Sequence, residues 1–247
     1  MSIIPELLEL LQAGVHFGHK TSRWHPKMAP FIFGERGGVH IVDLEKTQAQ
    51  LIRALEFVRQ LGVEGKVLLF VGTKKQAAPL LKKYAQDAGL PYVQNRWLGG
   101  TITNWVEIYR VIKKYNDLKD KQAKGELAKY TKKEQLDFSK EIERMSQLVG
   151  GIASLNKIPD ALFIVDIKQE DTAVREANQK HVPIVALCDT NVNPEVAQYP
   201  IAGNDDAIKS VEMITKLIAE AYKAGKGERQ TAEEAAKAPK VAEPVAA

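Results

Sequence analysis

Three aspartates follow apolar runs of the sequence in a pattern that could bind a metal ion. Asp189 ends the run "VPIVALCD" (182–189), and Asp205 and Asp206 come soon after "QYPIAG" (198–203). If both runs are strands of one parallel sheet, these carboxylates meet at the same edge, because neighbouring strands lie about 4.8 Å apart. They could share Mg²⁺, or Zn²⁺ if a histidine joined them. The alternative is that Asp205 and Asp206 cap the following helix.

The stretch "HFGHKTSRWHPKMAPF" contains two such histidines, His16 and His19, spaced by one helical turn. Either could join the aspartates at a metal ion, although ordinary hydrogen-bonded histidines would give the same spacing. The stretch has no acidic residue, so it could also bind a negatively charged partner. The residues that would form this surface are Lys20, Arg23, Trp24 and Lys27.

Two further segments are candidates for binding phosphate or RNA. In "FVGTKKQA" (70–77) only one glycine precedes the lysines, so the segment is not a P-loop. Lys74 and Lys75 could still hold a phosphate at a helix N-terminus, unless they are simply two solvated lysines. In "QNRWLGGTITNW" (94–105), paired glycines would let a partner approach the backbone. The side chains there that could contact RNA are Asn95, Arg96 and Trp97.

The motifs of common enzyme classes are absent from the sequence. It contains no Gly-x-Gly-x-x-Gly, Gly-x-Ser-x-Gly, His-Glu-x-x-His or Cys-x-x-Cys. The single cysteine, Cys188, lies in an apolar run and is expected to be a buried structural thiol. A protein-docking adaptor is one alternative to RNA binding. The other is a Mg²⁺-dependent enzyme handling phosphoryl groups or nucleotides with Asp166, Asp189, Asp205 and Asp206.

The composition fits a protein that binds a polyanion in a reducing compartment. The 247 residues carry 35 Lys+Arg and 31 Asp+Glu, a net charge of +4. Residues 1–150 carry a net +8 and residues 151–247 a net −4. One cysteine suits a reducing compartment, no apolar run approaches the ~20 residues of a membrane span, and the N-terminus resembles no leader peptide. We therefore expect a cytoplasmic protein.

Short apolar runs alternate with helical patterns, which predicts a doubly wound α/β fold with a parallel sheet. The stretch 31–44 predicts a small hairpin, with Gly34, Gly37 and Gly38 in its turn. The apolar runs are continuous, as expected for strands covered on both faces, and lie at 66–72, 90–95, 160–166, 182–189 and 198–203. Helices are expected at 43–64, 74–89, 169–181 and 206–224.

Residues 103–155 interrupt this alternation and predict an inserted antiparallel coiled-coil hairpin. Thr131 and Glu134 in "TKKE" could form a capping box at the start of its second helix. The first helix has heptad-spaced apolar residues at Ile108, Val111, Tyr115 and Leu118.

This pattern divides the chain into three parts. The α/β domain, with the N-terminal hairpin as an extension, comprises 1–102 and 156–225, and the coiled-coil hairpin comprises 103–155. The polar stretch 226–247 has little to bury and is expected to be a disordered tail.

Several long motifs, in order, resemble one family. "GVHFGHKTSRWHPKMAPFIFGERGGVHIVDLEKT", "FVGTKKQA", "QNRWLGGTITNW", "PDALFIVDI" and "VPIVALCDTNVNP" resemble segments of the bacterial small-subunit ribosomal protein S-two family. The resemblance runs from about residue 3 to 225. It implies a flavodoxin-like α/β domain that bears a coiled-coil hairpin.

The resemblance also implies a structural role in translation rather than catalysis. It implies a ribonucleoprotein component that binds 16S ribosomal RNA between the head and body of the small (30S) subunit, beside other small-subunit proteins. It implies a role in docking ribosomal protein S-one, which captures messenger RNA. No cofactor would be required, and neither a membrane nor a small-molecule substrate would be a partner. "HFGHKTSRWHPKM" and "GTKK" match family stretches that face or shape RNA, and Asp189, Asp205 and Asp206 match acids that can bind a cation near the S-one surface.

Overall fold

Five short parallel strands form the central sheet of the computed structural model, which describes residues 4–237. The strand order is β5-β4-β6-β7-β8, and every neighbouring pair is parallel. In chain order this is second, first, third, fourth, fifth, which is the flavodoxin-like form of a doubly wound sheet. The predicted fold class is therefore confirmed. The strands are β4 (Leu68–Val71), β5 (Tyr92–Val93), β6 (Ala161–Val165), β7 (Ile184–Cys188) and β8 (Tyr199–Ala202).

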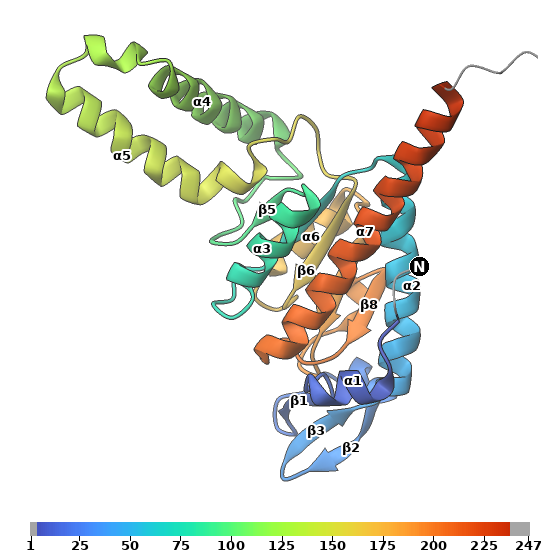
Figure 1. Cartoon of the computed structure of the whole chain (residues 1–247). Coiled ribbons are helices and arrows are strands. Elements are labelled where there is room, and N and C mark those ends of the chain that lie inside the picture. Colours follow the sequence, from blue (N-terminus) through green and yellow to red (C-terminus); the bar gives the residue numbers. More distant parts are fainter. Residues whose placement is uncertain (1–3, 238–247) are drawn as a thin grey trace, which may run out of the picture.

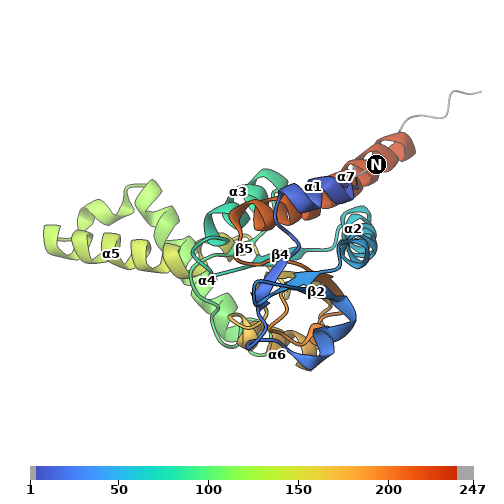
Figure 2. The ribbon, with the colours of Figure 1, turned by 90° about the horizontal axis from the view of Figure 1, so that it is seen from below.

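Helices cover both faces of this sheet (Figures 1 and 2). Successive strand residues enter different cores, so Phe70 packs in one core and Leu69 in the other. Because both faces are buried, the strands appear in the sequence as continuous apolar runs. The first core is closed by α2 (Leu44–Glu64), α3 (Ala78–Ala88) and α7 (Ile208–Lys237). The second is closed by α6 (Asp171–Gln179) and the first half of α4 (Trp105–Ala123).

The N-terminal region forms a second, three-stranded sheet rather than only the predicted hairpin. Its antiparallel order is β1-β3-β2, with β1 added to the edge of the hairpin. The sequence "FGHK" of β1 contains no apolar run, which is why the pattern did not predict a strand there. We call β1 (Phe17–Lys20), β2 (Ile32–Arg36) and β3 (Val39–Val42) the small sheet; α1 (Leu7–Gln12), η1 (Pro26–Phe31) and η4 (Pro194–Val196) are the remaining short helices of the domain.

The turn between β2 and β3 contains two glycines in the left-handed region. Gly37 and Gly38 have φ values of +61° and +74°, as both central residues of a type I′ turn require. Gly34 lies inside β2, beside an irregularity in the strand register, so its predicted place in the turn is wrong. Only two of the three glycines therefore form the turn.

Two helices, α4 and α5 (Lys132–Val149), form the arm, which projects from the sheet domain (Figure 1). They are joined through η2 (Glu126–Lys129), and η3 (Gly150–Ile152) returns the chain to the domain. An ion pair of 2.6 Å between Lys114 and Glu141 links α4 to α5. The predicted capping box is confirmed: the Thr131 hydroxyl accepts from the Glu134 amide, and the Glu134 carboxylate accepts from the Thr131 amide.

The buried stripe of α4 differs from the predicted one. Ile108, Ile112 and Tyr115 are buried, whereas Val111 is 39% exposed. The prediction for Val111 is wrong because the root of the arm packs against the sheet domain as well as against α5. The coiled-coil packing of the arm stays a prediction.

Helix α7 continues beyond the predicted end of the domain. The predicted tail begins at residue 226, but α7 runs to Lys237, so the prediction is wrong for residues 226–237. Their Ala, Glu, Lys, Arg and Gln residues favour a helix, and extending an existing helix needs no new nucleus. The rest of the predicted tail, 238–247, lies outside the described residues. In the described part of the chain, no helix combines the length and apolar character needed to cross a membrane.

Helices α2 and α7 cross closely at two glycines. A Cβ atom on Gly62 would lie only 2.5 Å from the carbonyl oxygen of Tyr222, and a Cβ atom on Gly225 would collide with the carbonyl oxygen of Arg59. Both obstacles are backbone atoms, which cannot turn away as a side chain can. The crossing therefore requires glycine at both positions.

The crossing predicts a loss of stability for Gly225→Ala. The added methyl group would overpack the contact with α2 and lower the free energy of unfolding by about 2 kcal/mol. Gly227→Ala is the matched control, because a Cβ atom there meets nothing within 4 Å. The control should gain up to about 1 kcal/mol from the higher helix propensity of alanine. Urea denaturation measures both changes, and similar stabilities of the two variants would contradict the close crossing.

Candidate nucleic-acid interface and cation site

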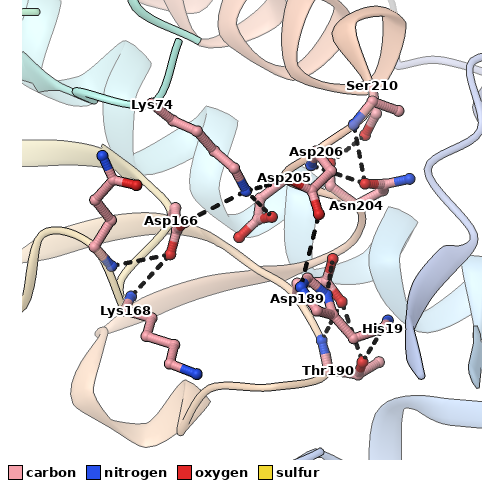
Figure 3. Close-up of polar contacts among 12 residues, drawn as sticks. His19, Lys74, Asp166, Lys168, Asp189, Thr190, Asn204, Asp205, Asp206 and Ser210 are labelled. Atoms are coloured by element: carbon pink, nitrogen blue, oxygen red, sulfur yellow. Dashed lines mark hydrogen bonds and ion pairs between the residues drawn. The ribbon is translucent and has the colours of Figure 1, made fainter. Parts of the chain in front are cut away.

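His19, Asp189 and Asp206 converge at the carboxyl edge of the central sheet (Figure 3). The aspartates follow β7 and β8, and His19 comes from β1 of the small sheet. The His19 Nδ1 atom lies 2.9 Å from Asp189 Oδ2, and Nε2 lies 3.6 Å from Asp206 Oδ2. One ligand atom from each residue falls within 4.8 Å of the others, so the three could hold a metal ion.

The other proposed histidine, His16, is not part of this group. The helical spacing expected for the two histidines does not occur, because His19 lies on a β-strand and His16 precedes it. The ring of His16 packs on Phe17, with centroids 4.0 Å apart. Its Nδ1 atom is buried and has no hydrogen-bond partner among the described residues.

Asp205 faces a lysine instead of the histidine. The Lys74 Nζ atom lies 2.8 Å from Asp205 Oδ1, 2.6 Å from Asp206 Oδ1 and 3.4 Å from Asp166 Oδ2 (Figure 3). These carboxylates neutralise the Lys74 ammonium, so it is not available to the external phosphate that the sequence analysis expected. The neighbouring Lys75 is exposed and remains available.

The burial of these groups changes their protonation. Burial raises the pKa of Asp205 to about 7, and the negative charges of Asp166 and Asp189 act in the same direction. The hydrogen bond to Asp189 raises the pKa of His19, although burial opposes it. Burial lowers the pKa of Lys74, but its hydrogen bonds to Asp205 and Asp206 outweigh burial and raise it overall. Lys74 therefore stays charged beside Asp205, whose carboxyl titrates near neutral pH.

The segment expected to bind phosphate is also satisfied internally. The backbone amide and hydroxyl of Thr73 donate to Glu170 Oε1 at 2.8 and 2.6 Å. Helix α3 begins only at Ala78, so Lys74 does not lie at its first turn. Doubly wound folds commonly bind ligands at this edge of the sheet. Here the edge carries carboxylates, which would repel the phosphates of a nucleotide.

Trp97 is a core residue rather than part of an RNA surface. Its side chain is 7% exposed, and its indole Nε1 donates to Glu176 Oε1 at 3.1 Å. Glu176 also accepts hydrogen bonds from the backbone amides of Gly100, Ile102 and Thr103, at 2.7 to 3.1 Å. This one carboxylate therefore fixes the loop that leads into the arm. The prediction that Trp97 contacts RNA is wrong, because the loop folds inward over α6.

Glu176 was missed by the sequence analysis, although a signal exists. It lies three residues after Ala173 and directly before Ala177, which places it on the buried face of α6. An acid on an apolar helix face indicates a buried polar partner. Burial opposes ionisation, but the hydrogen bonds from the loop together lower the pKa of Glu176. The residue therefore stays charged while buried.

The remaining predicted RNA-binding residues are exposed and, apart from Lys75, fall into two groups. Asn95 and Arg96 lie at the root of the arm, where the Asn95 side-chain amide donates to the Gln147 carbonyl at 2.8 Å. The other group lies at the small sheet, at the opposite end of the molecule (Figure 1). It comprises Lys20, Arg23, Trp24 and Lys27.

The raised pKa of Asp205 predicts a pH-dependent stability. Between the ordinary value of 3.8 and about 7, the folded protein binds more protons at this group than the unfolded chain. The free energy of unfolding should therefore fall as the pH rises through this range. Asp205→Asn should remove that fall, whereas Asp206→Asn, at a half-exposed neighbour, should retain it. Urea titrations at several pH values test this, and equal slopes in both variants would contradict it.

Comparison with known proteins identifies the family. The family model described as "Ribosomal protein S2" matches residues 10–225. The small ribosomal subunit protein uS2 of Coprothermobacter proteolyticus is 46% identical over 224 residues, covering 91% of this chain and 84% of the relative. The uS2 protein of Fusobacterium nucleatum is 45% identical over 226 residues, covering 91% of each chain. The resemblance seen in the sequence is confirmed, and the chain belongs to the ribosomal protein S2 family of the small ribosomal subunit.

Proposed function

We propose that this chain binds 16S ribosomal RNA between the head and body of the small subunit, chiefly through the exposed cations of its small sheet. Membership of the family makes it a structural protein of the ribosome, in the cytoplasm, and not an enzyme. The observation that carries the RNA proposal is the basic segment from β1 into η1. Lys27 pairs with Glu195, whereas Lys20 and Arg23 form no ion pair with a described carboxylate.

Exposed cations without internal partners suit a phosphate backbone. Each lysine or arginine that neutralises a phosphate releases a condensed counterion, which gives affinity and makes it depend on salt. Trp24 is 43% exposed, so its ring could stack on an unpaired base. Asn95 and Arg96 would add contacts at the root of the arm, and Lys75 would add one beside Lys74.

A bound cation is the second part of the proposal, at His19, Asp189 and Asp206. One imidazole and two carboxylates suit Zn²⁺ better than Mg²⁺, which prefers oxygen ligands alone. The residues fit such an ion, because their ligand atoms already lie within 4.8 Å of one another. Asp205 is held by Lys74 and would lie outside the ligand set.

The third part of the proposal concerns ribosomal protein S-one, which we propose docks on the small sheet beside this cation. Two apolar side chains support a docking surface there. Phe33 on β2 is 80% exposed, and Phe17 on β1, two residues from His19, is 49% exposed. Contiguous apolar patches on a protein surface mark sites where partners bind.

Charge reversal tests the RNA proposal. Replacing Lys20, Arg23 and Lys27 together with Glu should weaken binding to 16S ribosomal RNA and lower incorporation into small subunits. The slope of log affinity against log salt should fall by about 2 to 3, roughly one for each phosphate contact. Filter binding at several salt concentrations measures the slope, and co-sedimentation measures incorporation.

The matched control carries the same change of charge on α7. Lys209, Lys216 and Lys223 are exposed there, and their replacement with Glu leaves the small sheet untouched. The control should bind RNA with an almost unchanged salt slope. If both triple variants lost the same affinity, the effect would come from net charge and the small sheet would not be the interface.

Metal titration tests the cation proposal. Zn²⁺ should bind the purified protein in calorimetry, and Asp206→Asn should weaken binding by about 10- to 100-fold or more. Affinity should rise with pH, because the metal must displace the proton shared by His19 and Asp189. Asp171→Asn, at an exposed position on α6, is the control. Subunits assembled with Asp206→Asn should also retain less S-one, and full retention would separate the metal from docking.

A further inference from the structure

A polar cavity lies between the edge of the central sheet and the root of the arm. Its volume is about 370 Å³. Residues of β5 and α3 line one side of it and residues of the arm line the other. Figure 1 shows these elements close to where the arm joins the domain. The side chains that give it its chemistry are Lys82, Tyr92, Asn95, Tyr115, Lys119 and Ser146.

The charges around this cavity are only positive. Lys82 and Lys119 line it, and no carboxylate does. Neither lysine forms an ion pair with a carboxylate of the described residues. The larger cavity between α1 and α7, of about 750 Å³, is lined by three glutamates as well as two lysines. The cavity at the arm therefore suits a phosphate, and the larger one does not.

The uncharged groups of the cavity match those that recognise nucleotides. Tyr92 supplies an aromatic surface, and amide side chains from Gln94, Asn95 and Gln147 can donate to and accept from a base. Burial raises the pKa of Tyr92, and the neighbouring Tyr115 acts in the same direction. The Tyr92 hydroxyl therefore keeps its proton and can donate a hydrogen bond.

Two backbone segments border the cavity, and a glycine allows them to pack closely against each other. β5 is an edge strand, paired only with β4. Gly150 and Gly151 return the chain from α5 alongside this strand, and a Cβ atom on Gly151 would collide with the carbonyl oxygen of Tyr92. The cavity thus lies between the sheet edge and the arm, at a place where the turn after α5 packs closely on β5.

From these features we propose that the cavity binds one unstacked nucleotide of single-stranded RNA. Lys82 and Lys119 contact its phosphates, and Tyr92 and the amide groups contact its base. This proposal rests on the RNA binding proposed above and adds a specific site to it. The cavity would fix the arm relative to the RNA, because its walls come from both the sheet domain and the arm.

The test uses the full chain and three probes: a uridine pentanucleotide, AMP and inorganic phosphate. The pentanucleotide should shift the backbone amide resonances of Gly150 and Gly151 in NMR spectra. In the double variant Lys82→Gln/Lys119→Gln these shifts should disappear. The salt slope for the pentanucleotide should fall by about 1.4, since each phosphate contact of a single strand contributes about 0.7.

A control variant with the same change of charge is Lys83→Gln/Lys121→Gln. These lysines lie on the same two helices but do not line the cavity. The control should retain both amide shifts. If the glycine amides do not move, or move equally in the first variant, the cavity proposal is overturned. If AMP or phosphate moves them at lower concentration than the pentanucleotide, the ligand is a free small molecule and the RNA proposal for this cavity is overturned.

The outcome for the cavity can be separated from that for the proposed function. Binding of whole 16S ribosomal RNA is measured in parallel for the wild type and the Lys82→Gln/Lys119→Gln variant. If the wild type binds 16S RNA and the pentanucleotide leaves the cavity unchanged, only the cavity proposal fails. If the pentanucleotide enters the cavity and 16S RNA does not bind, the proposed function fails and the cavity assignment stands.

Discussion

The pairing of one lysine, Lys74, with three aspartates at the carboxyl edge of the central sheet is the interaction on which the arrangement of this molecule depends. Lys74 lies within 3.4 Å of carboxylates from Asp166, which follows β6, and from Asp205 and Asp206, which both follow β8. Without a cation, these acids would repel one another in a poorly solvated place. Doubly wound folds commonly bind a ligand at this edge of the sheet. Here Lys74 occupies that position, and its ion pairs with the aspartates contribute to the stability of the fold.

A buried carboxylate, on the helix α6 that covers one face of the sheet, likewise holds a loop in place through polar contacts. Glu176 accepts hydrogen bonds from several backbone amides of the loop before α4, just as Lys74 forms ion pairs with several aspartates. Both networks contain charged groups, which a purely apolar core would not contain. Both fix the position of loops rather than of strands. By contrast, the exposed Lys20 and Arg23 at the small sheet and Lys119 on the arm form no ion pair with a carboxylate of the described residues.

The sequence predicted the elements of the fold well, because a sheet buried on both faces leaves continuous apolar runs such as "ALFIV" of β6. It failed for groups whose partners are distant in the chain. The partners of Lys74 lie more than ninety residues away, and Glu176 is 79 residues from Trp97. A local pattern cannot show that a lysine is neutralised or that a tryptophan is covered. Hence the strands of the central sheet were predicted correctly, but Lys74 and Trp97 were assigned to the surface.

The close crossing of α2 and α7 also determines where the end of the described chain lies. From Gly225 to Lys237 the helix advances about 18 Å, at 1.5 Å per residue. Figure 1 shows this segment running past the sheet domain, away from the small sheet. A fluorophore attached to the exposed Thr231 in this part of α7 would therefore report on the intact ribosomal particle from a position distant from both the aspartates and the basic strand.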